Sequence, residues 1–442
     1  MKKIQISDHF KASTILLFAL PSIGMQLVDN TYQVADGYFI SNYVGASAFA
    51  AENLIFPPLM IVAGIGLMFG TGAAALISHT LGENDPEKAN CQLSLTVGTL
   101  AGVSVLASAL LFILLPWIMQ IVGVPENLVP MCLEYGQILA VCMPFLILNG
   151  AFHPLLITAN RPGLGLAVSI LNAAINILLD WILVGELGMK LTGAALATGV
   201  SWVCSATVPL VYFFNRRHPM HFGPFRWNAK ELGQTCYNGS SEMMGVISFA
   251  FITVLINSRL LRLAGEAGVD AYAVCSYAGG LFSTVFFGIG MSITPAVGYH
   301  HGENNPAEIR SILKNGTGLM AGLGLGIAVV CFAAARPIAM FFVGYEQKLA
   351  DLSVESLRIT SIAFLLSGLT NFYSSFFTGM GDAGRSLAIS VVKTVVLPLI
   401  GVFLLPLIFG RQGIWLMSLL SETGTFALAC VFLRIYQKKN IL

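Results

Sequence analysis

The stretch NCQLSLTVGTLAGVSVLASALLFILLPWIM, residues 90–119, decides the class of fold of this chain. It runs for 30 residues without a charged side chain. An α-helix needs about 20 mostly apolar residues to span a lipid bilayer. The stretch therefore predicts a transmembrane helix, and its extra length predicts a tilt or an extension beyond the membrane.

Comparable apolar stretches recur along the whole chain. Together with the first they make twelve, near residues 15–40, 48–80, 90–119, 129–157, 162–184, 191–215, 234–262, 269–300, 310–341, 350–378, 385–409 and 412–437. The composition agrees, because 56% of the residues are hydrophobic and only 10% are charged, whereas a soluble globular protein carries about 25% charged residues. We expect an all-α polytopic membrane protein with twelve transmembrane helices. The composition excludes a soluble enzyme, a disordered regulator and a nucleic-acid binder.

A repeated motif divides the chain into two halves. Residues 82–86, GENDP, recur 220 residues later as residues 302–306, GENNP. Each half holds six apolar segments, so the two halves run in the same direction across the membrane. Parallel repeats of this kind are typical of transporters, with a path between two lobes. We expect an N-terminal six-helix lobe at 1–215, a cytoplasmic linker at 216–233 and a C-terminal six-helix lobe at 234–442.

Basic residues predict how the chain is oriented. With the N-terminus inside, 16 of the 23 Lys and Arg residues fall on the cytoplasmic side and 7 on the outside. Cytoplasmic loops of membrane proteins carry such an excess of positive charge. We therefore expect an integral protein of the plasma (inner) membrane with both termini in the cytoplasm.

Acidic residues inside the first segment are candidates for function. A charge at the centre of a bilayer costs at least about 2.5–3.5 kcal/mol, so an ionisable residue there indicates a site. Asp29 and Asp36 are seven residues apart and share one helix face, with Tyr32 and Gln33 between them. Pro21 removes a backbone hydrogen bond early in the same segment and predicts a hinge.

The fifth and sixth segments add a polar stripe. Asn172, Asn176 and Asp180 follow one another at intervals of four residues, and Thr198 lies in a run of small residues in the sixth segment. If Asp36, Asn176, Asp180 and Thr198 share one pocket, their oxygens suit Na⁺. Two carboxylates in one site also repel each other, so a proton can bind instead. The alternative is that Asp180 and the asparagines only join helices together.

The sequence resembles those of the multidrug and toxic compound extrusion (MATE) family, within the multidrug/oligosaccharidyl-lipid/polysaccharide exporter superfamily. The stretches DGYFI at 36–40, GENDP at 82–86, NILLD at 176–180 and GAALAT at 193–198 carry the resemblance. It implies the branch with a cation site in the N-terminal lobe, held by Asp36, Asn176, Asp180 and Thr198, with Pro21 as the bending point. It also implies that Tyr32 and Asn172 line the same cavity.

Other ionisable residues fit the family less well. Other branches have a coupling glutamate deep in the seventh helix and an aspartate in the tenth; here Glu242 lies near the start of segment seven, and the core of segment ten has no aspartate. Glu242 would contact substrate or ion, or lie near the cytoplasmic surface. His153 would titrate in the cavity or pack beside Asn149. Glu52 would cap its helix or face the external mouth.

Two further features of the sequence leave several roles open. Lys393 inside segment eleven would snorkel to the membrane surface, pair with Glu422, or touch the cavity. The aromatic residues of segments seven and ten would stack on planar cationic compounds or simply pack. These aromatic residues are Phe282, Phe286, Phe287, Phe372, Tyr373, Phe376 and Phe377.

The predicted function is secondary active export. Amphipathic, often cationic drugs or toxic metabolites would leave the cell against inward Na⁺ or H⁺. The alternative is a flippase or exporter of a lipid-linked saccharide, or of one dedicated natural product; the pyrophosphate of a lipid-linked cargo calls for a basic cavity, whereas the mid-membrane charges here are mainly acidic. No recognised catalytic motif in this sequence supports a membrane-embedded enzyme. A passive channel is disfavoured as well, because its acidic residues would form a ring about an axis, whereas those of this chain cluster in one lobe. We expect no cofactor, no nucleic-acid partner, and a monomer in the lipid bilayer.

Overall fold

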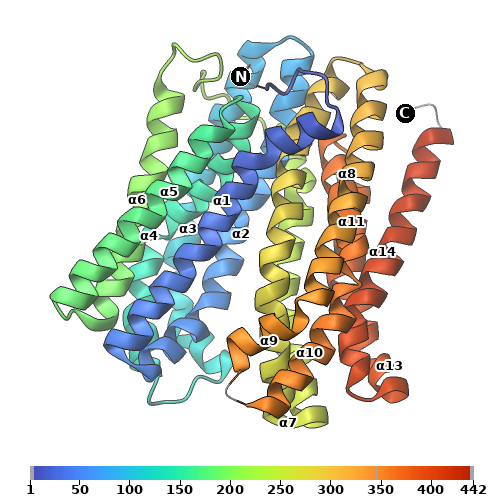
Figure 1. Ribbon diagram of the computed structural model, residues 1–442. Helices are drawn as coiled ribbons and strands as arrows, with labels where there is room; N and C mark the ends of the chain where they lie inside the picture. Colours follow the sequence, from blue (N-terminus) through green and yellow to red (C-terminus); the bar gives the residue numbers. More distant parts are fainter. Residues whose placement is uncertain (1–3, 345, 439–442) are drawn as a thin grey trace. The chain divides into compact units, whose positions relative to one another are not determined.

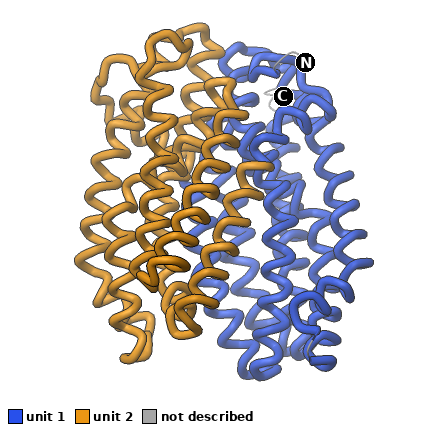
Figure 2. Tube along the Cα trace, turned by 60° about the vertical axis from the view of Figure 1, so that its left-hand side comes forward, with its two compact units in different colours: residues 1–23, 240–442 blue, residues 24–239 orange. Residues whose placement is uncertain are grey.

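The computed structural model describes residues 4–344 and 346–438, and helices account for nearly all of them (Figure 1). No strand occurs in those two ranges. Two compact units are defined by contacts within the chain, residues 1–23 with 240–442 and residues 24–239 (Figure 2). This division falls inside the first helix, whereas the predicted lobes begin at residue 1 and at residue 234. Those lobe bounds stay a prediction about the two halves of the chain.

The unit of residues 24–239 contains most of the first half of the chain. Its helices are the later part of α1 (Ala12–Phe39), α2 (Ala46–Gly82), α3 (Pro86–Val122), α4 (Val129–Thr158), α5 (Pro162–Asp180) and α6 (Lys190–Phe214). Two short π-helical segments extend α1 and α5, namely η1 (Ile40–Val44) and η2 (Trp181–Glu186). α4 is central, because it packs against α2, α3 and α6, while α5 packs on α6.

The unit of residues 1–23 and 240–442 contains the remaining helices. They are most of α7 (Ala229–Gly302), then α8 (Pro306–Ala333), α9 (Ala335–Val343), α10 (Gln347–Ser361), α11 (Phe364–Gly379), α12 (Ala383–Val391), α13 (Leu397–Phe409) and α14 (Gln412–Lys438). A third π-helical segment, η3 (Val392–Val396), joins α12 to α13. α11 packs on α8 and α14.

The prediction of an all-α membrane protein with twelve transmembrane helices is confirmed. Ten helices among the described residues are long and apolar enough to cross a membrane, and α10 with α11, bent by 48°, makes an eleventh. α7 is 74 residues long, but the backbone at Gly265 is not helical, with φ 66° and ψ −162°. This break divides α7 into the two predicted segments 234–262 and 269–300. A positive φ is accessible to glycine without steric cost, which explains the residue type at the break.

Both copies of the repeated loop have the same local structure. Asn84 and Asn304 adopt a left-handed backbone, with φ of 63° and 55°. The next residue caps a helix in each copy: a side-chain oxygen of Asp85 accepts a hydrogen bond from the Lys88 amide at 3.0 Å, and Asn305 does the same for Glu308 at 3.1 Å. A proline then occupies the first helical turn, where no amide hydrogen is needed. The repeat is therefore structural.

Small residues allow helices to approach closely inside the unit of residues 24–239. At Gly72 of α2, an added Cβ would lie 1.9 Å from the backbone oxygen of Thr235 in α7. Large apolar side chains instead point outward from α3, and Ile113, Trp117 and Ile121 are all exposed. This distribution is typical of membrane helices, which use small residues at contacts and apolar residues toward lipid.

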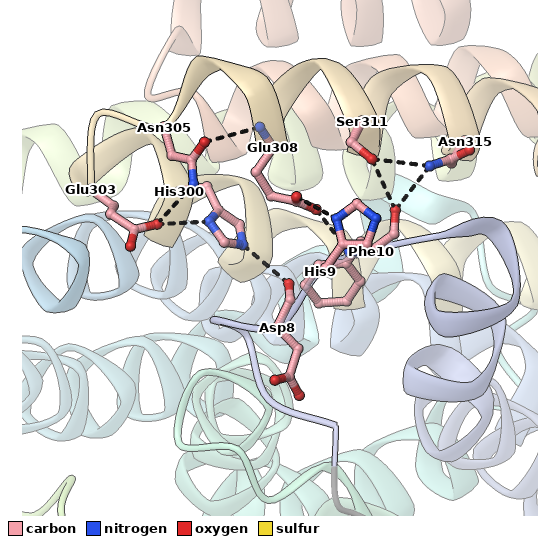
Figure 3. Close-up of polar contacts among 9 residues, drawn as sticks. All are labelled: Asp8, His9, Phe10, His300, Glu303, Asn305, Glu308, Ser311 and Asn315. Atoms are coloured by element: carbon pink, nitrogen blue, oxygen red, sulfur yellow. Dashed lines mark hydrogen bonds and ion pairs between the residues drawn. The ribbon is translucent and has the colours of Figure 1, made fainter.

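The N-terminal strap, residues 4–11, docks on the start of α8. The Glu308 carboxylate accepts a hydrogen bond from the Phe10 amide at 2.8 Å, and its other oxygen lies 2.6 Å from His9 Nδ1. Asn315 donates to the Phe10 carbonyl at 3.0 Å, and the Phe10 ring is fully buried (Figure 3). The following turns of α1 pack on α7, where the Ser22 and Ser292 hydroxyls are 2.7 Å apart. The strap therefore ties the start of α1 to the second half of the chain.

Candidate functional site

The predicted ion-coupling residues lie together within the unit of residues 24–239. The carboxyl group of Asp36, in the C-terminal part of α1, faces the side chains of Asp180, Thr198 and Asn176. Asp36 comes from the turn of α1 just before η1, and Asp180 is the last residue of α5 before η2. The structure thus brings all four residues into one cluster, from three different helices.

Hydrogen bonds join the two neutral members of this cluster to each other and join Tyr135 to Asp36. Asn176 donates its amide to the Thr198 hydroxyl at 3.1 Å, which joins α5 to α6. The Tyr135 hydroxyl, from α4, reaches Asp36 Oδ2 at 3.4 Å. Asn176 and Asp180 have no exposed surface, and Asp36 is only 5% exposed. The cluster is therefore shielded from both lipid and bulk solvent.

Four oxygens in this cluster accept no hydrogen bond from the described residues. They are Asp36 Oδ1, Asn176 Oδ1 and both carboxylate oxygens of Asp180. A buried polar oxygen without a partner is costly, and a buried carboxylate is more so. Carboxylate and amide oxygens are the ligands that hard cations prefer. The chemistry of the donor set therefore fits Na⁺, or one or more protons on the carboxyl groups.

A small cavity opens beside the cluster. Its volume is about 50 Å³, and it is lined by Tyr32, Gln33, Asp36, Glu52, Phe56, Leu59, Met60, Tyr135, Leu139, Thr198 and Trp202. A single water needs about 10–15 Å³ by the same measure. The cavity can hold an ion with a few waters and is too small for a drug-sized molecule, since ligand pockets usually measure about 300–1,000 Å³.

Tyr32, one turn before Asp36, and Asn172, one turn before Asn176, lie together. The Tyr32 hydroxyl faces the side chains of Asn172 and Trp202. Ser205 of α6 links the oxygen of Asn172, at 3.3 Å, to the amide of Asn149, at 2.7 Å. Gln33 is exposed on α1 and lines the cavity. The structure thus places these predicted cavity residues next to the cluster.

His153 and Glu52 occupy positions that the sequence left open. His153 lies 3.8 Å from Asp29, measured from Nδ1 to Oδ2, while Asn149 bonds to Ser205 instead. Glu52 stands almost two turns inside α2, which begins at Ala46, and so it does not cap that helix. It lines the cavity beside Asp36.

The ionisable residues of the second half form a separate group. Lys393, on η3, pairs with Glu422 at 3.0 Å, and the Thr370 hydroxyl joins both, at 2.9 Å from Lys393 and 2.6 Å from Glu422. Of the three roles that the sequence left open for Lys393, the structure therefore shows pairing with Glu422. Glu242 lies within electrostatic range of Lys393.

The aromatic residues of α7 and α11 mostly pack inside their own unit. Phe286, Phe372, Phe376 and Phe377 are completely buried. The ring of Phe376 contacts those of Phe372 and Phe377, and Phe377 also contacts Phe432 of α14. Of the two alternatives, packing is therefore the one that the structure supports for these four residues.

Sequence reasoning missed two contributors to the cluster. Tyr135 is one of several polar residues in α4, next to Glu134, and its spacing relative to Asp36 carries no pattern. Trp202 lines the cavity but reads as ordinary core in the sequence. A π-helical segment directly follows α1, which carries Asp36, and another follows α5, which carries Asp180. Such segments are frequent at functional sites. The sequence contains no pattern that predicts them.

Comparisons with known proteins identify the family and the fold. The MatE family model matches residues 21–182 and 242–404, once in each half. The multidrug export protein MepA of Staphylococcus aureus (strain MRSA252) is 24% identical over 97% of this chain and 94% of its own length. The crystal structure of a MATE protein in complex with MaL6 superposes with a TM-score of 0.91 at 19% identity, covering 98% of both chains. The crystal structure of a mutant of the Vibrio cholerae MATE transporter VcmN superposes with a TM-score of 0.89, also at 19% identity, covering 97% of both chains.

Among the described residues, no group of three or more His, Cys, Asp and Glu side chains gathers as a metal site would require. The likeness to the solved structures shows the fold alone at this level of identity.

Proposed function

The chain belongs to the MatE family, whose model matches it in both halves, and on that premise we propose that it is a secondary active multidrug exporter. It moves amphipathic, often cationic compounds or toxic metabolites outward against inward Na⁺ or H⁺. It does so as a monomer in the plasma (inner) membrane, with both termini in the cytoplasm. The terminal residues themselves lie outside the described ranges.

The buried pair of carboxyl groups, Asp36 and Asp180, carries this proposal. Four oxygens around them lack a hydrogen-bond donor, and no basic side chain forms an ion pair with either acid in the described part of the chain. An entering cation or proton would neutralise charge that is expensive inside a membrane. Occupancy of the site therefore changes the energy of the surrounding helices, which is the requirement for coupling.

Asn176 and Thr198 supply the neutral part of the site. Their hydrogen bond of 3.1 Å uses the amide nitrogen of Asn176 and leaves its amide oxygen without a hydrogen-bond partner among the described residues. Asp36 is carried by α1, which also contains Pro21. Neutralisation of Asp36 would favour a different bend of α1 at Pro21, and with it a cavity that releases cargo to the outside.

The energetics set a condition on stoichiometry. One charge that moves inward through 100 mV releases about 2.3 kcal/mol, which supports a concentration ratio of about 40 for a neutral cargo. Exchange of one ion for one monovalent cationic compound moves no net charge. The membrane potential then contributes only if two ions enter, and two carboxyl groups give the site capacity for two protons.

Dye efflux from proteoliposomes tests the proposal. Na⁺ and pH gradients are imposed separately on wild type, Asp36→Asn and Asp180→Asn, with Glu87→Gln as a control carboxylate at the exposed start of α3. We expect gradient-driven efflux in wild type and control and its loss in both aspartate variants; the more effective gradient identifies the ion. Wild-type rates in both aspartate variants would overturn the proposed site.

A further inference from the structure

A second pair of ionisable side chains lies on the same face of α1 as the proposed ion site. Asp29 is seven residues before Asp36, about 10 Å along the helix axis. Its Oδ2 is 3.8 Å from Nδ1 of His153 on α4. The two side chains keep 26% and 13% of their surface exposed, whereas Asp180 has none. A ligand can therefore reach Asp29 where it cannot reach Asp180.

The surroundings leave the charge of Asp29 dependent on His153. On α1, the neighbouring ionisable groups are Tyr32 and, beyond it, Asp36. From α5, the hydroxyl of Ser169 faces the carboxyl group. Within the described ranges, no second basic side chain forms an ion pair with Asp29. A hydroxyl stabilises a carboxylate only in part, so the imidazole is its one available counter-charge.

The imidazole supplies that counter-charge only when it carries a proton. Histidine is the side chain that ordinarily changes charge between pH 5 and 8. When His153 is protonated, it neutralises Asp29. When it is neutral, Asp29 is a partly exposed acid in the middle of a membrane helix, and such an acid needs a cation or a proton from elsewhere.

We propose that Asp29 and His153 form a second binding site, in which the positively charged centre of an exported compound and the proton of His153 exclude each other. At neutral His153 the cationic centre lies against the Asp29 carboxylate. Protonation of the imidazole places a positive charge 3.8 Å from the same carboxylate and expels the compound. One positive charge is exchanged for another, and no bond other than that to the proton is formed or broken. This inference rests on the proposed function, because it assigns that function's cationic cargo to a place.

The site differs from the proposed ion site in location and in chemistry. Asp36 and Asp180 are enclosed and lie beside a cavity of about 50 Å³, which suits an ion. Asp29 and His153 are more exposed and combine an acid with a base. A proton delivered here would act directly on the cargo, in addition to any coupling through Asp36.

Equilibrium binding of tetraphenylphosphonium, a permanent monovalent cation, to the purified full-length protein in detergent tests the inference. Calorimetric titrations at pH 8.0 and pH 5.5 compare wild type with Asp29→Asn and His153→Asn. We expect wild-type affinity to fall by about tenfold at pH 5.5, the loss of one charge contact in a partly exposed site. Asp29→Asn should bind about tenfold more weakly than wild type at pH 8.0, with little dependence on pH.

His153→Asn is the discriminating variant. It should bind tightly at both pH values, because Asp29 then has no internal competitor. If the pH effect comes from Asp36 or Asp180, it will persist in this variant, and the inference is wrong. Titrations at pH 6.0 in two buffers of different ionisation enthalpy should show release of up to one proton per bound cation in wild type and none in His153→Asn.

Two controls make every outcome decisive. His79→Asn removes a histidine in the last turn of α2, which lies 3.7 Å from the Glu83 carboxylate and forms no ion pair with Asp29, and it should leave binding unchanged. Triphenylphosphine oxide, a neutral compound of similar shape, should bind without pH dependence. Absence of tetraphenylphosphonium binding in wild type, or unchanged binding in Asp29→Asn, overturns the inference. The gradient experiment on Asp36 and Asp180 decides the proposed function separately.

Discussion

Tyr135 offers a quantitative test of the proposed ion site. Its hydroxyl donates to Asp36 Oδ2 at 3.4 Å, and Tyr135→Phe removes that donor while it preserves the ring in a nearly enclosed position. A hydrogen bond to a charged group is worth about 1.5–3 kcal/mol, but 3.4 Å is long for two oxygens. We therefore assign this hydrogen bond about 0.7–1.4 kcal/mol, which corresponds to a shift of about 0.5–1 unit in the pH midpoint of efflux.

The sign follows from which form of Asp36 the hydroxyl stabilises. The bond favours the carboxylate over the protonated carboxyl group. Its removal therefore lets the site accept a proton at lower proton concentration, so the pH of half-maximal proton-driven efflux should rise by about 0.5–1 unit. Dye efflux from proteoliposomes over pH 5–9 measures this midpoint.

A matched control isolates the hydrogen bond from the general loss of a hydroxyl. Tyr212 of α6 also has a buried hydroxyl, and that group has no hydrogen-bond partner among the described residues. Tyr212→Phe should leave the midpoint unchanged. A midpoint for Tyr135→Phe within about 0.2 units of wild type, or a shift toward acid pH, would refute the reasoning.

Three further variants test other parts of the structure. Thr198→Val removes the hydroxyl that accepts the amide hydrogen bond from α5; the coupling-ion concentration for half-maximal efflux should rise about 3- to 10-fold. Lys393→Met leaves Glu422 without its ion-pair partner. The free energy of unfolding in detergent should then fall by about 2–4 kcal/mol. This is near the lower end of the cost of breaking a fully buried ion pair, because both side chains are slightly exposed. Gly72→Ala places a methyl group 1.9 Å from a backbone oxygen, whereas Gly102→Ala meets nothing within 4 Å; only the former should lose most of its monodisperse yield.

Much of the fold followed from the sequence because membrane helices have a strong compositional signature. The twelve apolar segments and the repeated loop are visible without any structure, and the break in α7 was expected as a boundary between two segments. Its cause, the backbone at Gly265, was not, since glycines are common throughout this chain. The π-helical segments were also missed, because one additional residue in a helical turn leaves no periodic signal.

The site was partly predictable for a similar reason. Spacing of four and seven residues placed Asp36, Asn176 and Asp180 on their helix faces, and the structure brings these faces together. Glu52 and Tyr135 could not be assigned, because no spacing within α2 or α4 links either residue to Asp36. Only the packing of these helices brings the two side chains beside it. The pairing of Lys393 with Glu422 was one of several open choices, since 29 residues separate them and no pattern selects a partner.

The N-terminal strap has a consequence for how the chain is made. His9 and its partner Glu308 are 299 residues apart, so at about 5–20 residues per second the ribosome delivers the partner about 15–60 s after the strap. During that interval the first turns of α1 have neither α7 nor α8 on which to pack. The first helix to enter the membrane is therefore among the last to be completed, and a chain interrupted before residue 308 leaves its own beginning unfinished.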